Sequence, residues 1–431
     1  MALEKIVIGR NVKDMQAFGL TGTAFIGRHI VGKGEEAHLT NPICMDVVRP
    51  HIVLITGKRG SGKSYSACVI GEEITMLPPE IKNNLSVLMI DTMGIFWSMG
   101  KPNEKDTELL KEWGLKSKGM DVRLFVPKMF AEEYENIGIK VNRKLKLPCG
   151  ELTALDWILT FRFDPMDAHG LAIERIIKSM KKRYENIYSV DDIINEIQED
   201  QRTDQKIKNA LTSRFESARD WGIFEKKGTS VKDLFQKGKV SIIDVSHFPR
   251  TESGWGVRSM VIGMLARRIF QYRLRARKGE EFEIMSGEAE ETIPMVWMII
   301  DEAHQFIPSE GKTAATEPML TLVKEGREPG ISLVLITQMP NKLHPEALAQ
   351  SDLIISHRLT AEADINALRS IMQTYVLKDI KELINSLPRQ TGAAIVLDDN
   401  SERLYSVQVR PRLSWHAGGS PAAIKEKGLF D

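Results

Sequence analysis

The 431-residue sequence lacks three features that would assign it to a specialised class of protein. Its cysteines, Cys44, Cys68 and Cys149, form no CxxC pair, which argues against a zinc-ligand set or a disulfide framework. Its net charge of +1 excludes a strong overall attraction to nucleic acid or to an anionic membrane. No apolar run approaches about 18 residues, the length of a bilayer-spanning helix, and the opening MALEKIVIGR has no signal-peptide core. We therefore expect a soluble, cytoplasmic protein without membrane contact.

The order of apolar runs predicts an α/β fold with further regions around it. The chain is longer than one compact core usually supports, so we expect several structural units. They are a small barrel-like N-terminal β region (1–50), the first part of the α/β core (51–124), a helical insertion (125–236), the second part of the core (237–360) and a C-terminal helix, hairpin and extended tail (361–431).

The most informative motif is HIVLITGKRGSGKS, which ends at Ser64. Its apolar run at 52–56 predicts a buried strand, the next residues match GxxxxGK[ST], and 65–74 predicts a helix. In this context backbone N–H groups surround phosphates, Lys63 reaches the β- and γ-phosphates, and the Ser64 hydroxyl binds Mg²⁺. The residues that we expect to contact the nucleotide lie in this loop and at the start of the helix: Gly57, Arg59, Gly60, Ser61, Gly62, Lys63, Ser64 and Tyr65.

Carboxylates and amides follow other predicted strands of the core. The apolar run at 295–300 ends in Asp301 and Glu302, two charges that are costly to bury without a partner. In a P-loop protein Asp301 would hold Mg²⁺, and Glu302 would orient and polarise the water that attacks the γ-phosphate. Gln338 ends the next strand, where it either senses the γ-phosphate or simply terminates the strand. Asp91 ends another strand, as a metal or substrate contact or as a helix cap.

The helical insertion shows no catalytic motif. Apolar spacing predicts a helix at 165–184, a capping box at Ser189 begins another, and a third covers 204–219. The basic run 181–183 either ends its helix in solvent or binds a ligand.

A long helix is predicted from the end of the polar turn 246–256 to about residue 277. Its arginines form either a solvated face or a surface that meets phosphates or a neighbouring subunit: Arg267, Arg268, Arg273, Arg275 and Arg277. The turn carries Trp255, which either faces a shared central channel or anchors the helix. The acidic stretch 280–291 predicts an exposed loop.

Several stretches together resemble the HerA family, hexameric ATPases of the FtsK–HerA branch of P-loop motors. They are the P-loop strand, the inserted helices, DEAHQFIP and KEGREPGISLVLITQMPNKLHPEALAQSDLIISHRL, and the likeness extends to LPRQTGAAIVL and VQVRPRLSWHAGG. The glycine-rich segment with two IGR sequences resembles a reduced form of the β-barrel that precedes the HerA motor. The resemblance implies a RecA-like P-loop NTPase core with a mainly parallel sheet, ATP and Mg²⁺ as ligands, and a homohexameric ring that moves on or unwinds double-stranded DNA.

The resemblance also implies roles for single residues. Lys63 and Ser64 match the Walker A pair, Asp301 and Glu302 match the Walker B pair, and Gln338 matches the polar residue of the following strand. Two arginines complete the set, because Arg327 resembles the finger that reaches a neighbour's γ-phosphate, and Arg49 matches a further basic residue of the nucleotide site.

The family commonly works with a partner nuclease, NurA, in DNA end processing, and some relatives work with effectors of phage defence. This sequence departs from the family pattern at Met339, where arginine is usual, and at 91–94, where DTMG replaces a DPHGE-like sequence. An alternative function is a nucleotide-gated ring scaffold that assembles and regulates an effector without moving DNA. A small-molecule kinase is less well supported, since Glu302 would activate water and waste the phosphate.

Overall fold

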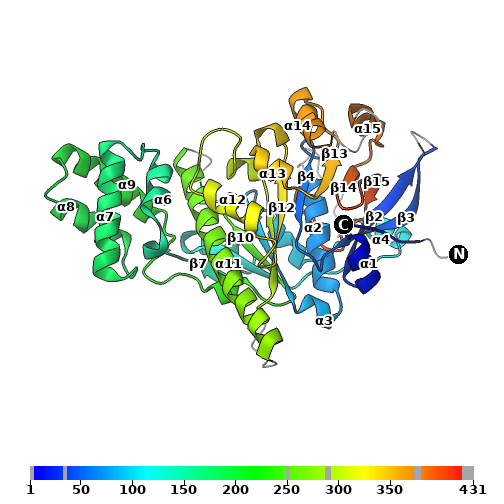
Figure 1. Ribbon diagram of the computed structural model, residues 1–431, viewed down its shortest axis with the longest axis horizontal. Coiled ribbons are helices and arrows are strands. Elements are labelled where there is room, and N and C mark those ends of the chain that lie inside the picture. The colour runs from blue at the N-terminus through cyan, green and yellow to red at the C-terminus, as the bar shows by residue number, and fades with distance from the viewer. Residues whose placement is uncertain (1–3, 33–35, 249–251, 287–292, 373–379, 420–431) are drawn as a thin grey trace.

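The computed structural model describes residues 4–32, 36–248, 252–286, 293–372 and 380–419. These residues form a large central sheet with helices on both faces (Figure 1). In spatial order the strands are β1 (Ile6–Ile8), β3 (His38–Asp46), β2 (Thr23–Val31), β15 (Arg403–Val409), β14 (Ala393–Asp398), β13 (Leu353–His357), β4 (Ile52–Thr56), β12 (Ile331–Thr337), β11 (Met295–Ile300), β5 (Leu85–Asp91), β10 (Val240–Asp244), β6 (Val122–Pro127) and β7 (Arg143–Leu145).

The part of the sheet from β13 to β7 is parallel throughout. Its central strands read as continuous apolar runs because helices cover both faces, as the sequence predicts. The register aligns Thr56 with Thr337 and Asp91 with Asp244, so the carboxyl ends of these strands share one edge. This edge, which we call the catalytic edge, brings together the polar residues that follow β4, β5, β11 and β12.

Helices on the two faces bury two separate cores. Alternate strand residues divide between them, so that Leu54 belongs to one core and Val53 to the other. The first core includes residues of α11 (Glu252–Ser286) and α12 (Thr316–Glu325), and the second includes residues of α2 (Lys63–Met76). Further helices are α3 (Pro79–Lys82), α4 (Thr107–Glu112), α5 (Ala131–Asn136), α10 (Val231–Leu234), α13 (Pro345–Ala349), α14 (Glu362–Met372) and α15 (Ile380–Ser386). Of these, α5 and α10 lie within the stretch predicted as the helical insertion.

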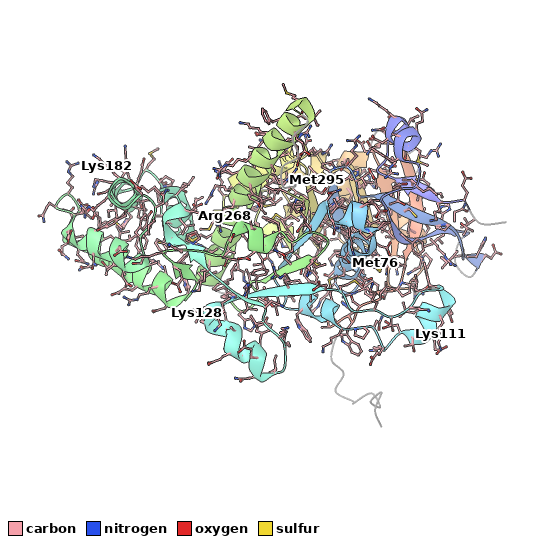
Figure 2. The ribbon with its side chains drawn as sticks, turned by 90° about the horizontal axis from the view of Figure 1, so that it is seen from below. Met76, Lys111, Lys128, Lys182, Arg268 and Met295 are labelled. Atoms are coloured by element: carbon pink, nitrogen blue, oxygen red, sulfur yellow. The ribbon has the colours of Figure 1, made fainter. Side chains whose placement is uncertain are left out.

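The helical insertion forms one end of the molecule, as Figures 1 and 2 show. Its helices are α6 (Ala154–Phe161), α7 (Ala168–Tyr184), α8 (Val190–Glu199) and α9 (Gln205–Asp220), and a two-stranded sheet of β8 (Leu147–Pro148) and β9 (Phe224–Glu225) lies at its base. The predicted capping box is confirmed, because Ser189 and Asp192 exchange side-chain to backbone hydrogen bonds. Lys182 of α7 and Lys111 of α4 lie at opposite ends of the molecule in Figure 2. Among the helices of the described segments, none combines the length and apolar character needed to span a bilayer.

The N-terminal strands do not close into the small barrel that the sequence suggested. Instead β2 pairs antiparallel with β15, which extends the central sheet through the C-terminal hairpin. The physical reason is that β15 otherwise offers an open edge, and pairing satisfies its backbone groups. A short helix that the sequence analysis missed, α1 (Val12–Phe18), begins where the Asn11 side chain accepts the backbone N–H of Asp14.

The long helix α11 is longer than predicted at both ends. It begins at Glu252 within the predicted polar turn and continues to Ser286, so the predicted acidic loop is wrong for residues 280–286. Arg277 pairs with Glu280 and Glu281 one turn later, and such pairs stabilise a helix end. The hypothesis that the turn at 251–256 faces a channel depends on the Trp255 side chain, which lies outside the described residues.

Candidate nucleotide-binding and catalytic site

The phosphate loop connects buried strand β4 to helix α2, in the order that the motif predicts. Gly62 has a φ of 113°, a conformation that residues with a Cβ rarely adopt. A Cβ on Gly57 would lie 2.5 Å from the Ser61 hydroxyl oxygen and 2.6 Å from the Cβ of His357, so only glycine fits there. These glycines allow the tight backbone turn before a helix N-terminus that is typical of phosphate-binding loops.

Lys63 lies in the first turn of α2 and is 6% exposed. Its Nζ donates to the carbonyl oxygen of Lys58 at 3.0 Å, which holds the side chain along the loop. Burial lowers the pKa of Lys63, while the charges of Glu302 and Asp301 oppose this shift. Lys63 is thus close enough to the two carboxylates to interact with them electrostatically.

Asp301 and Glu302 follow β11 at the catalytic edge and are both buried. Burial, followed by the charge of Glu302, raises the pKa of Asp301 to about 7. Glu302 has a φ of 50°, an uncommon left-handed conformation for a residue with a side chain. Two adjacent carboxylates in a strained turn at a strand end indicate a functional site rather than packing alone.

Gln338 donates a hydrogen bond from its Nε2 to Glu302 Oε1, which brings together two predicted site residues from neighbouring strands. His304, which the sequence analysis did not single out, lies 3.6 Å from Glu302 Oε2 through its Nδ1. The same Nδ1 lies 3.0 Å from the Thr337 hydroxyl. Burial lowers the pKa of His304, which favours a neutral imidazole next to the glutamate. Gln338 therefore holds one oxygen of the Glu302 carboxylate, and the His304 ring lies next to the other oxygen.

The donor set suits a magnesium ion that is bound mainly through a nucleotide. The Ser64 hydroxyl and the Asp301 carboxylate are hard oxygen donors, and the raised pKa of Asp301 shows an excess of buried negative charge that a cation would relieve. No cluster of three or more histidine, cysteine or acidic side chains with metal-binding geometry occurs within the described segments. The residues thus fit an ion that keeps water and phosphate ligands.

Two cavities with different linings lie beside the phosphate loop. One of about 560 Å³ is lined by Lys58, Arg59, Glu302 and Gln338 among others. The second, of about 410 Å³, is lined by Tyr65 and by residues that the sequence analysis assigned to no site, and its walls are more apolar. These residues include Leu39, Trp113, Gln408, Val409 and Pro411. Sequence patterns did not point to this cavity because its walls come from distant segments, although the last three residues lie in the VQVRPRLSWHAGG stretch that resembles the HerA family.

The two predicted arginines lie away from the catalytic edge of their own chain. Arg327 follows α12, donates to the carbonyl oxygen of Gln350 at 2.7 Å and lies 3.5 Å from Asp352. Its side chain is 42% exposed. Because it precedes β12, the length of that strand, roughly 23 Å for seven residues, separates it from its own Gln338.

Arg49 is a correction to the predicted nucleotide site. It precedes β4 and forms a 2.7 Å ion pair with Asp14, at the opposite end of the strand from Gly57. The five-residue strand separates the two ends by roughly 16 Å, so Arg49 does not line the phosphate loop of its own chain. Of the two roles considered for Asp91, the structure favours the cap. Its carboxylate accepts hydrogen bonds from the backbone N–H groups of Gly94 and Phe96, both at 2.7 Å, and thus caps a turn.

His357 is a residue of this region that sequence reasoning missed. Its Nε2 lies 2.9 Å from the Ser66 hydroxyl and its Nδ1 lies 3.0 Å from the carbonyl oxygen of Ala393. Burial lowers its pKa to about 4, so the ring is neutral and packs beneath the phosphate loop. The available signal was its place at the end of β13, a parallel strand beside β4.

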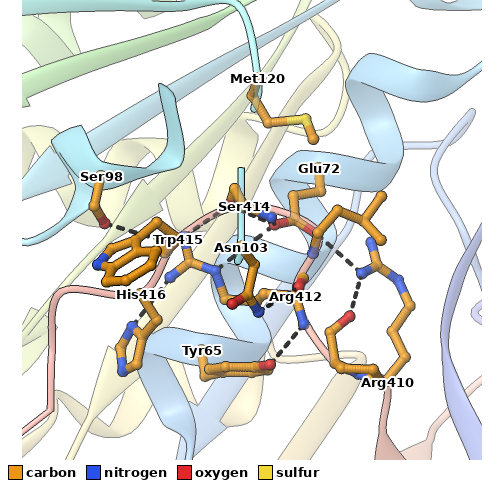
Figure 3. Close-up of polar contacts among 12 residues, drawn as sticks. Tyr65, Glu72, Ser98, Asn103, Met120, Arg410, Arg412, Ser414, Trp415 and His416 are labelled. Carbon is orange, nitrogen blue, oxygen red and sulfur yellow. Dashed lines mark hydrogen bonds and ion pairs between the residues drawn. The ribbon is translucent and has the colours of Figure 1, made fainter. Parts of the chain in front are cut away.

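Helix α2 is fastened to the C-terminal segment by buried charges (Figure 3). Glu72 is fully buried, lies 2.9 Å from Arg410 Nη1 and accepts the backbone N–H of Ser414 at 2.9 Å. One residue after the phosphate loop, the Tyr65 hydroxyl accepts the backbone N–H of Arg412 at 2.6 Å. We call these five residues the Glu72 cluster. It fixes the helix that carries Lys63.

Comparison with known proteins gives one family and one fold. The family model described as "Helicase HerA, central domain" matches residues 24–269. The DNA double-strand break repair helicase HerA of Pyrococcus furiosus is 30% identical over 127 residues, which cover 28% of this chain and 22% of the relative. The probable DNA double-strand break repair helicase HerA of Methanocaldococcus jannaschii is 24% identical over 181 residues, or 38% of this chain and 33% of that protein. The matches thus span a third or less of these two relatives.

Two solved structures share the fold at low sequence identity. VirB4 of Thermoanaerobacter pseudethanolicus has a TM-score of 0.55 and 12% identity, with 90% of this chain and 97% of that chain covered. The bacterial conjugative coupling protein TrwBdeltaN70 has a TM-score of 0.50 and 13% identity, with 92% and 96% covered. Together with the observed sheet, these likenesses confirm the predicted α/β P-loop fold.

Proposed function

This chain belongs to the family of HerA central-domain helicases, and on that premise we propose that it is an ATP-hydrolysing motor that moves on double-stranded DNA as a homohexameric ring. The observation that carries the hydrolytic part of the proposal is the hydrogen bond from Gln338 to Glu302, at the edge where the phosphate loop ends. A buried glutamate held in this way, within electrostatic range of Lys63, suits a base that positions water.

In the proposed reaction each residue has one task. Lys63 binds oxygens of the β- and γ-phosphates, and the N–H groups of the loop hold the phosphate chain in place. Glu302 accepts a proton from the attacking water, and Gln338 orients the water and the Glu302 carboxylate. Magnesium, held by Ser64 and Asp301, would offset the negative charge on the phosphates. The products are ADP and inorganic phosphate.

The different linings of the two cavities favour one orientation of the bound nucleotide. The cavity with Glu302 and Gln338 takes the γ-phosphate and the water, because these are its polar groups. The cavity with Tyr65 and Trp113 takes the base and ribose, because apolar and aromatic walls suit a purine ring. The phosphate chain then lies across the loop between them.

The position of Arg327 is consistent with the proposed ring. It is half-exposed at the edge of the sheet opposite its own Glu302, so we propose that it serves the γ-phosphate of a neighbouring subunit. Arg327→Ala should lower ATP turnover by about 10³-fold, while Lys324→Ala in the preceding helix α12 should leave it unchanged. Mixing Arg327→Ala with Glu302→Gln subunits should restore part of the activity, because some interfaces then have both groups. Normal turnover by assembled Arg327→Ala rings would contradict this role.

DNA-stimulated ATP hydrolysis tests the motor. We expect linear duplex DNA to raise the turnover of the wild type and not of Glu302→Gln, with the exposed Glu310→Gln as a matched control. The net charge of +1 favours the alternative, a nucleotide-gated scaffold for an effector, which predicts ATP-dependent assembly without DNA stimulation. A NurA-like nuclease or another effector, in end processing or phage defence, is the partner that the family resemblance suggests.

A further inference from the structure

Helix α11 contains six arginines; Arg258 is buried near its start, and the other five divide into two groups. Arg273 is buried, donates to the carbonyl oxygen of Pro329 at 2.7 Å and lies 3.0 Å from Glu280. Arg277 pairs with Glu280 and Glu281. These two arginines stabilise the last turns of the helix and a neighbouring loop, so they are occupied by structural contacts.

The other three arginines line an open cavity of about 470 Å³ where α11 meets the helical insertion. Arg267 forms two hydrogen bonds, of 3.0 and 2.6 Å, with the carboxylate of Asp156. Arg268, labelled in Figure 2, lies 3.1 Å from Glu151 and donates to the carbonyl oxygen of Thr229 at 2.9 Å. These contacts hold both guanidinium groups at the cavity wall.

Two further cations face the same cavity, and neither belongs to an ion pair among the described residues. Lys181 comes from α7 and Arg275 from the next turn of α11, and they join Arg267 and Arg268 in its lining. Asp156 and Glu151 offset two of the four positive charges, which leaves an excess of +2. The protein as a whole has a net charge of only +1, so this excess is a local feature.

The environment of Lys181 shows what is missing from the cavity. Burial lowers its pKa, the charge of Asp156 opposes this shift in part, and the charge of Arg267 lowers the pKa further. A partly dehydrated ammonium group near a second cation gains most from a nearby anion. The amide of Gln271 lines the same space and can supply a neutral hydrogen bond.

We propose that this cavity, formed by Lys181, Arg267, Arg268 and Arg275, binds a phosphate group and is separate from the phosphate loop. Guanidinium forks match the geometry of phosphate oxygens, and the volume lies within the usual range for small-ligand sites. The phosphate belongs either to a small phosphorylated molecule or to a nucleic-acid backbone. None of these residues lines either cavity beside the phosphate loop, so the inference does not depend on the proposed ATPase activity.

The test is a double charge reversal, Lys181→Glu with Arg275→Glu, in a Lys63→Ala background that removes phosphate binding at the loop. The matched control is Lys182→Glu with Lys278→Glu, which changes the net charge equally on the same two helices at exposed positions. Neither Lys181 nor Arg275 belongs to a buried ion pair, and equal unfolding temperatures for the two variants would check that both fold. Binding is measured with inorganic phosphate, with adenosine monophosphate and with a labelled single-stranded oligonucleotide.

We expect the double reversal, and not the control, to weaken binding of at least one probe by about tenfold or more, since charge-assisted hydrogen bonds are lost. Loss with phosphate and the monophosphate identifies a small ligand, and loss with the oligonucleotide alone identifies a nucleic-acid backbone. Equal binding of all three probes by both variants would overturn the inference. Weakened binding of a polyglutamate peptide alone would also overturn it, in favour of an acidic protein partner.

Discussion

A buried carboxylate near the C-terminal end of helix α2 is paired with arginines, whereas the buried carboxylates at the catalytic edge lie next to each other. In the Glu72 cluster the carboxylate lies 2.9 Å from Arg410 and 3.7 Å from Arg412, with backbone donors around it. At the catalytic edge Asp301 is equally buried, yet its nearest acidic neighbour is Glu302 and its pKa is raised to about 7.

This difference distinguishes carboxylates that stabilise the fold from carboxylates that are available to bind a ligand. A buried ion pair that is fully hydrogen-bonded satisfies itself and needs nothing from solution. Carboxylates that are buried beside each other cost stability until a cation or proton arrives. Asp244 occupies an intermediate position, since the Tyr134 hydroxyl donates to it while Asp91 lies close enough to influence it. Burial together with Asp244 raises the pKa of Asp91 well above its usual value.

The largest expected effect comes from breaking the Glu72 cluster. Arg410→Met removes the guanidinium group that pairs with both Glu72 and Glu73 and leaves the buried charge of Glu72 with only the more distant Arg412, so the free energy of unfolding should fall by about 3–5 kcal/mol. Chemical denaturation with the exposed Arg403→Met as control measures this. An unchanged midpoint would mean that the cluster does not stabilise the fold.

The next effect is on catalysis and leaves the fold intact. Glu302→Gln keeps the shape of the side chain and removes its charge, so ATP turnover should fall by about 100-fold or more while nucleotide binding persists. Steady-state hydrolysis and equilibrium binding of a labelled nucleotide, measured on one preparation, separate the two properties. If turnover stays near the wild-type value, another residue activates the water.

A pH series sharpens the comparison at Asp301. Because its folded-state pKa of about 7 lies above the ordinary value of 3.8, ionisation of Asp301 reduces stability progressively as the pH rises between these values. The ligand-free Asp301→Asn variant should therefore gain in unfolding temperature relative to wild type from about pH 4 to pH 7. The exposed Asp220→Asn should show no such trend. A constant difference across the series would contradict an unpaired buried charge at Asp301.

The smallest effect concerns the single hydroxyl that joins α2 to the C-terminal segment. Tyr65→Phe removes the acceptor of the Arg412 backbone N–H and should lower the free energy of unfolding by about 1 kcal/mol. Tyr405→Phe, at a half-buried tyrosine of β15, is the control for loss of a hydroxyl. A large loss of ATP affinity in Tyr65→Phe would show that the hydroxyl acts on the nucleotide instead.

Local patterns were sufficient to predict the central strands and the phosphate loop, but not β6 and β7, which belong to the sheet although most of their residues lie in the predicted helical insertion. Buried parallel strands such as β4 and β11 consist of apolar runs that end in functional residues, and both signals are contiguous in the sequence. The ring geometry and the roles of Arg327 and Gln338 stay predictions, although the structure brings Gln338 to Glu302. Arg49 was placed wrongly because adjacency in sequence to β4 does not tell which end of the strand meets the phosphate loop.

Contacts between distant segments could not be predicted in this way. In the sequence, Glu72 is one polar residue of a predicted helix. Nothing near it in the sequence indicates that Arg410 is its partner. The same holds for Trp113 in the second cavity and for Lys181 beside Arg275, which depend on how the insertion packs against α11. Patterns of period two or 3.6 carry no information about such pairs.

The pairing of β2 with β15 has a consequence for how the chain folds during its synthesis. Arg410 donates to the carbonyl oxygen of Phe25, 385 positions earlier, and Val407 pairs with His29 in the sheet. Strand β2 therefore leaves the ribosome long before β15, the strand with which it pairs. Until then β2 has a bare edge that other chains can pair with, so slow translation of the C-terminal hairpin should favour aggregation over folding.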